Sequence, residues 1–257
     1  MTHKTLKHLA AIAIVCAAAS SVTFAVGNGL PFVANEDVVP GAFARTLNSN
    51  SLDFTYHSCV DFLQVPPEQP PQFRESGYFW VSSYQNLTSV VDSQINYFDV
   101  NGYRIYAKYS YGAQFFNFHN PSPSGLRLNY VAPQQPAVIE LYLDWQSNTV
   151  LDLQQCAPVA ISGDNDDILL GSSATLNMGE KSEAANVAAN GDFELRFGDW
   201  AFTNFGASIF QFPQPAAFYR LVVNANITRL IAGALNTDHK AEGSGNLFWW
   251  PQPQPQD

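Results

Sequence analysis

The sequence has few charged residues and little positive charge. Only 13% of its 257 residues are charged, and 12 Lys and Arg stand against 22 Asp and Glu, a formal net charge of −10. Binding to nucleic acid or to an anionic membrane surface depends on clustered positive charge, so this composition argues against both classes of partner. The hydrophobic content of 46% is too high for a disordered chain.

Sequence motifs of catalysis and cofactor binding are absent as well. The chain contains no GxSxG, HExxH, GxxxxGKS/T or GxGxxG pattern. Beyond residue 25 it has only His57, His119 and His239, which lie far apart in sequence. It has no CxxC pair, which argues against a cysteine zinc site or a redox motif. We therefore predict no catalytic residue, no cofactor and a non-enzymatic function.

One enzymatic alternative stays open, because a secreted glycoside hydrolase needs only two carboxyl groups. Glu140 and Asp144 fall on the same face of a predicted strand, but four residues of extended chain separate their backbones by roughly 13 Å. Retaining glycosidases hold their carboxyls about 5 Å apart and inverting ones up to about 9 Å. A catalytic pair would therefore have to be assembled from different strands.

The acidic loop Gly163–Asp167 is the best candidate for a metal site. Asp164, Asp166 and Asp167 offer the oxygen ligands that calcium prefers. The spacing does not fit an EF-hand, whose sixth and twelfth positions would be Leu169 and Thr175 here instead of Gly and Glu. Short Asp/Asn loops are also ordinary turns, so we predict no metal and keep these three aspartates as weak calcium candidates.

The N-terminal segment has the pattern of a secretory signal peptide. Lys4 and Lys7 precede the apolar run Leu9–Ala19, and small residues lead to a cleavage site after Ala25. We predict that residues 1–25 are removed, which leaves a formal charge of −12 and an extracellular protein, with the periplasm as the alternative location. An uncleaved anchor is the competing interpretation; no later run is long enough for a membrane span.

The cysteine count agrees with export. Cys16 lies in the predicted signal peptide, which leaves Cys59 and Cys156 in the mature chain. A single pair in an exported protein predicts one disulfide. The alternative is two buried free thiols.

Alternation of apolar and polar residues dominates the rest of the chain and predicts an all-β fold. The segments with strand character are 51–59, 77–84, 103–111, 126–131, 138–145, 192–197 and 218–231. We expect one domain over residues 26–250, an antiparallel two-sheet sandwich or jelly-roll with at most one or two short helices, such as 180–189. A closed barrel is the alternative architecture. Residues 251–257, PQPQPQD, form a Pro/Gln-rich tail.

Five short, hydrophobic segments lie along the chain: FRESGYFWVSSYQNLTS (73–89), INYFDVNGYRIYAKYS (95–110), IELYLD (139–144), DDILLGSS (166–173) and GSGNLFW (243–249). Together these segments resemble the flocculation-associated PEP-CTERM proteins, a family of exported bacterial proteins. The chain ends in WPQPQPQD in place of that family's Pro-Glu-Pro motif, apolar helix and basic end. The resemblance implies a secreted, non-catalytic matrix or cell-aggregation protein and supplies no functional residues.

These observations predict a secreted surface or extracellular-matrix protein that acts in adhesion, biofilm formation or cell aggregation. Its expected partners are further copies of itself or extracellular polysaccharide. A carbohydrate-binding module is the first alternative, because Trp80, Trp145, Trp200, Trp249 and Trp250 would stack on sugar rings wherever they are exposed. By pattern, Trp80 and Trp145 are expected in the core, whereas Trp249 and Trp250 are harder to bury.

Overall fold

The fold is given by a computed structural model that describes residues 29–63, 72–87, 89–96, 102–116, 127–129, 137–153, 159–176, 192–213, 219–232 and 238–251. The predicted signal peptide, the helix predicted over 180–189, His119, Cys156 and tail residues 252–257 lie outside these ranges.

Antiparallel strands make up most of the described chain, which confirms the all-β prediction. The large sheet contains β3 (Ser51–Leu63), β4 (Gln72–Asn86), β5 (Ser89–Val91), β6 (Arg104–Phe116), β7 (Arg127–Asn129), β8 (Val138–Asp144), β11 (Ile168–Ser173), β12 (Thr175–Leu176), β13 (Asp192–Gly198), β14 (Ala201–Phe202), β16 (Tyr219–Ala232) and β17 (Asp238–Pro251). Its strand order is β12-β13-β16-β17-β3-β4-β6-β8-β11-β14, with β5 beside β4 and β7 beside β6.

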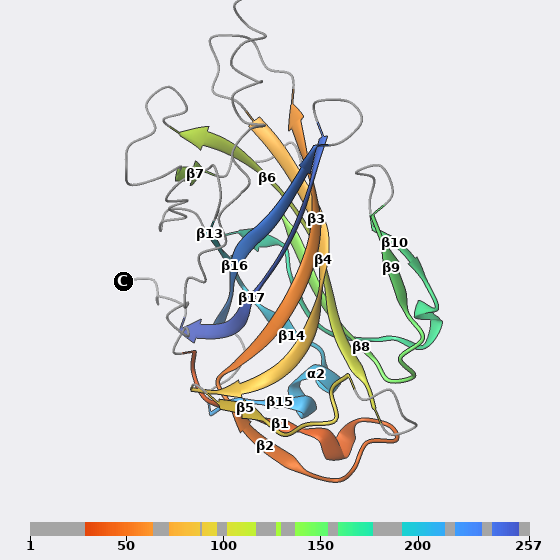
Figure 1. Cartoon of the computed structure of the whole chain (residues 1–257). Helices are drawn as coiled ribbons and strands as arrows, with labels where there is room; N and C mark the ends of the chain where they lie inside the picture. Colours follow the sequence, from red (N-terminus) through yellow and green to blue (C-terminus); the bar gives the residue numbers. More distant parts are fainter. Residues whose placement is uncertain are drawn as a thin grey trace, which may run out of the picture.

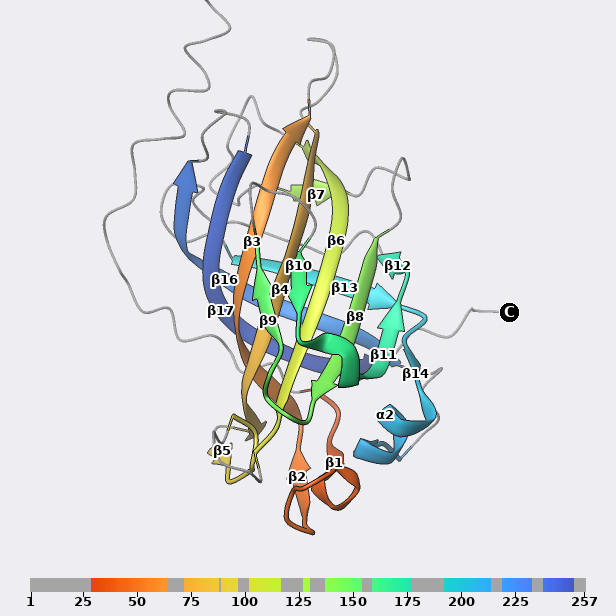
Figure 2. The ribbon, with the colours of Figure 1, turned by 90° about the vertical axis from the view of Figure 1, so that its right-hand side faces the viewer.

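Smaller elements pack around this sheet. They are β1 (Phe32–Asn35), β2 (Thr46–Ser49), β9 (Val150–Asp152), β10 (Ala160–Ser162), β15 (Phe210–Gln211), the 3-10 turns η1 (Glu36–Val38) and η2 (Asp164–Asp166), and the short helix α2 (Asn204–Ile209). The sheet β15-β1-β2 lies across the base of the long strands, and the hairpin β9–β10 lies outside them (Figures 1 and 2). No helix among the described residues is long and apolar enough to cross a membrane.

The large sheet curls until its two ends meet. Gly171 and Ser172 of β11 face Phe202 and Ala201 of β14. The same register continues where Thr175 and Leu176 of β12 face Gly198 and Phe197 of β13. One residue separates β11 from β12, and two separate β13 from β14, so one bent antiparallel ladder joins the ends. The two packed layers expected from the sequence are thus opposite walls of one sheet.

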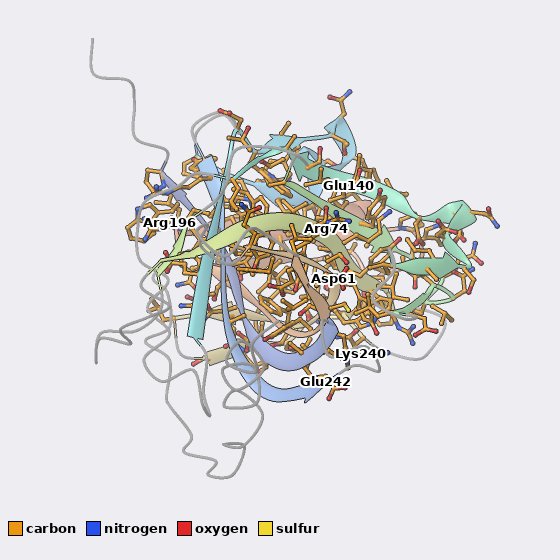
Figure 3. All side chains as sticks on the ribbon, turned by 90° about the horizontal axis from the view of Figure 1, so that it is seen from above. Asp61, Arg74, Glu140, Arg196, Lys240 and Glu242 are labelled. Carbon is orange, nitrogen blue, oxygen red and sulfur yellow. The ribbon has the colours of Figure 1, made fainter. Side chains whose placement is uncertain are left out.

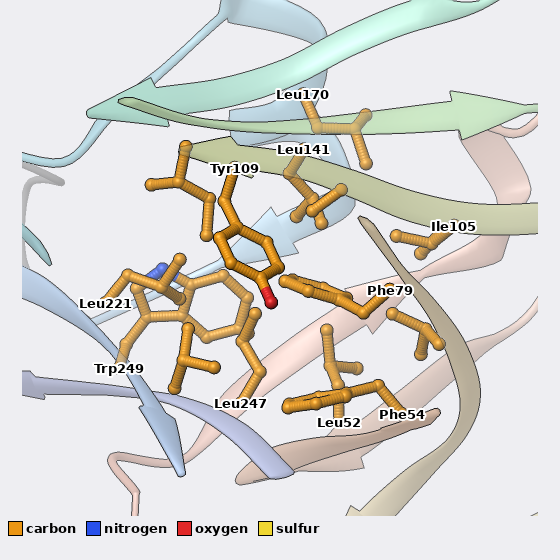
Figure 4. Close-up of a cluster of buried hydrophobic side chains, with 14 of the residues drawn as sticks. Leu52, Phe54, Phe79, Ile105, Tyr109, Leu141, Leu170, Leu221, Leu247 and Trp249 are labelled. Carbon is orange, nitrogen blue, oxygen red and sulfur yellow. The ribbon is translucent and has the colours of Figure 1, made fainter. Parts of the chain in front are cut away.

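Alternation along the strands places one set of side chains inside the curled sheet. Figure 4 shows Phe54, Phe79, Tyr109, Leu141 and Trp249 converging from different strands, and each is buried. Their rings pack closely, with the stacked rings of Phe54 and Phe79 centred 4.7 Å apart. A cavity of about 10 Å³ next to Tyr56 and Tyr109 has room for about one water molecule. In this part of the interior the space is filled by side chains.

The predicted faces of three strands agree with the observed burial. Residues 103, 105, 107, 109 and 111 of the β6 region, residues 139, 141 and 143 of β8, and residues 195 and 197 of β13 are all buried. Trp145 was expected in the same inner row as Leu143. It lies just beyond the end of β8, partly buried and packed against the core, and donates its indole N–H to the Asp166 carbonyl at 3.1 Å.

Helix α2 closes part of the base by docking on a β-bulge in β11. The pairing of β8 with β11 shifts between Leu169 and Gly171. The carbonyl of Leu170 accepts a hydrogen bond from the Thr203 N–H at 2.9 Å. Thr203 also caps the helix, because its hydroxyl accepts from the Gly206 N–H. A Cβ on Gly206 would lie 1.8 Å from the Leu170 carbonyl oxygen, so only glycine allows this approach.

A buried carboxylate fastens the N-terminal turn η1 to the large sheet. Glu36 is 1% exposed and accepts hydrogen bonds from the Tyr103 hydroxyl at 2.7 Å and the Gln94 N–H at 2.8 Å. Its second oxygen accepts from the Nε of Arg45. The Tyr103 hydroxyl also lies 3.2 Å from that of Tyr84. One side chain therefore joins three segments of the chain.

We predict that Glu36→Ala destabilises the protein by about 3 kcal/mol, because it leaves buried donors and a partly buried guanidinium without their acceptor. Chemical denaturation would measure the loss. The matched control is Asp37→Ala, an exposed carboxylate one residue away. Equal stability losses in the two variants would contradict this account.

A second buried carboxyl, Glu75 of β4, lies inside the sheet. It is 6% exposed, and it accepts hydrogen bonds from the Tyr109 hydroxyl at 3.0 Å and from the Tyr111 hydroxyl. Burial raises the pKa of Glu75, and the hydrogen bonds from the two phenols act in the opposite direction. Negative charge on Glu75 in turn adds to the effect of burial in raising the pKa of both tyrosines.

Glu75 should make the folded state less stable as the pH rises. Between the ordinary pKa of a glutamate, about 4.5, and its raised folded value, the folded protein holds a proton that the unfolded chain has lost. Stability from this group is therefore complete below about pH 4.5 and falls as the pH increases. We expect Glu75→Gln to remove this dependence, so the variant gains stability relative to the wild type as the pH rises above about 4.5.

Denaturation midpoints at a series of pH values would test this, with Glu242→Gln on the outer surface as the control for removing one negative charge. A difference between Glu75→Gln and the wild type that stays constant with pH would contradict the predicted titration.

Candidate functional site

Two rows of polar and aromatic side chains cross the outer face of the large sheet. In the first, Trp80 of β4, Tyr106 of β6 and Tyr142 of β8 face one another in register. The rings of Tyr106 and Tyr142 stack with centroids 5.2 Å apart, and Trp80 lies 5.3 Å from Tyr106. The second row, on the same strands, contains Tyr78, Lys108 and Glu140.

Two cations lie over rings of this face. The guanidinium carbon of Arg104 is 5.6 Å from the Trp80 ring centroid, and the ammonium of Lys108 is 4.5 Å from that of Tyr142. Lys108 also forms an ion pair with Glu140 at 3.5 Å. Figure 3 shows Glu140 of β8 and Glu242 of β17 at different parts of the outer surface. The aromatic row is therefore bordered by cations in a protein that is acidic overall.

The hairpin β9–β10 covers part of the outer face. Leu151 of β9 and Leu153, which follows β9, are buried, and Lys240 of β17 donates from its ammonium to the Leu153 carbonyl at 2.9 Å. This cover buries Tyr106, which is 1% exposed although it points away from the core, and Asp144, which is fully buried. Asp144 accepts hydrogen bonds from the N–H groups of Asn148 and Thr149, both at 3.1 Å, and so shapes the turn into β9.

The acidic loop fastens the same hairpin to the sheet. Asp167 accepts hydrogen bonds from the hydroxyls of Tyr106 and Thr149, both at 2.6 Å. Burial raises the pKa of Asp167, while these two hydrogen bonds act to lower it. Asp166 accepts from the Asn148 amide at 3.2 Å. Among the described residues no three Asp, Glu, His or Cys side chains are grouped as metal ligands, and the weak calcium candidates Asp164, Asp166 and Asp167 are not gathered around one point.

An open groove of about 400 Å³ lies between the hairpin and the outer face, and we call it the outer groove. Its lining residues are Trp80, Asn96, Arg104, Thr149, Val150 and Leu151. Asn96 is held in place because its amide donates to the carbonyls of Val81 at 2.6 Å and Ser82 at 3.1 Å. Val150, which is 59% exposed, forms the outer rim. An indole, a guanidinium, a fixed amide and apolar walls suit a flat ligand with hydroxyl groups.

The structure separates the other residues that the sequence singled out. Glu140 contacts Lys108 and Tyr142, whereas Asp144, the last residue of β8, is buried and binds the turn before β9, so the two carboxyls serve different contacts. His57 lies on the outer face of β3, 3.7 Å from Glu242. His239 belongs to β17. Cys59 is buried in β3, but Cys156 lies outside the described residues, so the predicted disulfide stays a prediction.

The tryptophans that are buried are not the ones expected from the sequence pattern. Trp200 and Trp249 are buried at the base of the core, where their rings lie 6.5 Å apart, and Trp250 is 40% exposed. Trp80, expected in the core, lines the outer groove. Sequence reasoning did not identify Arg104 or Asn96. The only available signal was position: Arg104 lies on the polar face of its strand, next to an aromatic row.

Comparison of the chain with protein-family models, with curated proteins and with solved structures finds no match. The resemblance to flocculation-associated PEP-CTERM proteins stays a prediction.

Proposed function

We propose that this is a secreted, non-catalytic protein of the extracellular matrix that binds polysaccharide through the outer groove. The observation that carries the proposal is the position of Trp80, whose ring lies in an open groove beside Arg104 and Asn96. Aromatic rings pack against the apolar faces of sugars, while guanidinium and amide groups hydrogen-bond to their hydroxyls.

The position of the groove supports binding of a polymer. It is open on the outer face of the sheet, so a long chain can pass across it without having to enter the core. Its volume of about 400 Å³ is within the range of small-ligand sites and fits a few sugar units of a longer chain. The signal-like N-terminus and the resemblance to exported matrix proteins support an extracellular setting.

We expect Trp80→Ala to weaken polysaccharide binding about tenfold or more, which corresponds to about 1.4 kcal/mol, because the stacking surface is lost. The matched control is Tyr78→Ala, which removes an aromatic ring from the same face of the same strand outside the groove. Affinity electrophoresis in gels containing a neutral glucan or a polyuronate would measure binding, with thermal unfolding to check the fold.

Unchanged binding in Trp80→Ala, or equal losses in both variants, would contradict the role of the outer groove. Release of reducing sugar in the same mixtures would instead favour the hydrolase alternative.

Sedimentation at several salt concentrations, with and without polymer, would separate polymer binding from self-association. With a predicted mature charge of −12, self-association should increase as salt screens repulsion between copies.

We also propose that Cys59 and Cys156 form a disulfide in the exported protein. Cys59 faces Lys240 in the pairing of β3 with β17, and Lys240 binds the carbonyl of Leu153, three residues before Cys156. Lys240 therefore lies beside Cys59 in the sheet and also contacts Leu153, the last described residue before Cys156.

We expect peptide mapping without reduction to recover the linked pair, and Cys156→Ser to lower stability by about 2–5 kcal/mol. Reduction of the wild type should cause a similar loss, which serves as the control. Reaction of both cysteines with a thiol reagent in unfolded, unreduced protein would show that they are not paired.

A further inference from the structure

A second groove lies at the base of the molecule, on the outer face of the sheet β15-β1-β2. Its lining residues are Pro31, Phe32, Val33, Asn48, Ser49, Asn86, Gln211, Phe212 and Pro213, and we call it the amide groove. Its volume is about 530 Å³, larger than that of the outer groove. It belongs to different strands from those that form the outer groove.

Strand pairing sets the amide side chains in a row. Val33 of the central strand β1 faces Gln211 of β15 on one side and Asn48 of β2 on the other. Phe32 and Ala34 point into the core and are buried, so Val33 and its two neighbours point outward. Asn86, at the end of β4, supplies a third amide.

These amides are available to a ligand. Asn48, Asn86 and Gln211 are exposed, and within the described part of the chain the side chains of Asn48 and Asn86 have no hydrogen-bond partner. Gln211 uses its NH₂ group to donate to the Ser208 carbonyl at 3.3 Å, which leaves its carbonyl oxygen as an acceptor. The groove therefore offers two complete amides and one further acceptor.

A rigid aromatic wall stands beside the amides. Phe212 is partly exposed in the groove, and its ring lies 4.8 Å from Tyr219, 5.2 Å from Trp249 and 5.4 Å from Phe32. Ser49 fixes the β2 side, because its hydroxyl donates to the Gln85 carbonyl at 2.7 Å. The aromatic wall and the β2 side of the groove are therefore fixed before a ligand binds, and only the exposed amide side chains have to be ordered.

The chemistry of the lining selects a neutral ligand. None of its nine residues carries an ionisable side chain, so a charged ligand would find no counter-ion. Each free amide presents both a donor and an acceptor, which matches a hydroxyl group, and Phe212 with two prolines supplies apolar surface for a sugar ring. We infer that the amide groove binds a neutral, hydroxyl-rich saccharide. Together with the outer groove this would make each molecule a cross-linker of polysaccharide chains, and the cross-linking rests on the proposed function.

The test uses the double variant N48A/Q211A and, as matched control, N165A, which removes an exposed amide from η2. The probes are dextran, a neutral glucan, and alginate, a polyuronate, measured by affinity electrophoresis with Trp80→Ala in parallel. We expect N48A/Q211A to weaken dextran binding about tenfold, to leave alginate binding unchanged, and to abolish the rise in light scattering that cross-linked dextran produces. The isosteric variant N48D/Q211E, which replaces amides by carboxylates, should show the same loss of dextran binding. It provides the test if the alanine variant folds poorly.

The inference about the amide groove would be overturned if both double variants bound dextran as tightly as the wild type. It would also be overturned if the wild type did not bind dextran. A second copy of the chain as occupant would appear as wild-type dimerisation that N48A/Q211A removes without polymer, and this result would also overturn the inference. The two proposals fail separately: the proposed function fails if Trp80→Ala has no effect, and the amide groove fails if N48A/Q211A has none.

Discussion

The bent ladder between residues 171–176 and 197–202 is the constraint on which the rest of the structure depends. It joins strands that would otherwise be the two ends of the large sheet. Closure gives every long strand an inner and an outer face, and the inner faces meet in one aromatic core. It also pairs backbone groups that open edges would expose to neighbouring copies. Short strands such as β2 and β10 are left as edges, and among the described strands residues 192–196 of β13 are paired only with β16.

The two buried glutamates, Glu36 and Glu75, have different surroundings and different effects on the fold. Glu36 accepts hydrogen bonds from separate segments and includes a cation among its partners, so it fixes where the N-terminal turn lies. Glu75 has two phenols around it, and among the described contacts its hydrogen-bond donors are uncharged. A carboxyl in such a setting is better tolerated with its proton than without it. Glu36 therefore fixes the N-terminal turn at the base of the sheet, whereas Glu75 is the group from which a pH dependence of stability is predicted.

Strict alternation made much of the fold predictable from the sequence. Leu195 and Phe197, or Ile139 and Leu141, point inward because a strand with one buried face repeats every two residues. Strand β17 was not predicted, since Gly243 and Gly245 interrupt its pattern. The structure explains Gly245: a Cβ there would lie 2.1 Å from the Asn224 carbonyl oxygen and 2.9 Å from the Phe54 ring.

The candidate sites were less predictable, because they depend on contacts between distant segments. Trp80 follows the inward Phe79 and so points outward, yet nothing in its neighbourhood shows that Val150 and Leu151 form the opposite wall of a groove. The row of Gln211, Val33 and Asn48 likewise depends on the pairing of three short strands that come from separate parts of the sequence.

Hydrogen bonds between described residues hold the hairpin that forms one wall of the outer groove at two places, in addition to the burial of Leu151 and Leu153. One is the bond from Lys240 to the Leu153 carbonyl, and the other is the pair of bonds that Asp167 accepts from Thr149 and Tyr106. If the hairpin separated from the sheet, the groove would lose a wall while the core stayed intact. If the outer groove binds polymer as proposed, its affinity includes the free energy of keeping the hairpin against the sheet, and bound polymer would in turn favour the assembled groove.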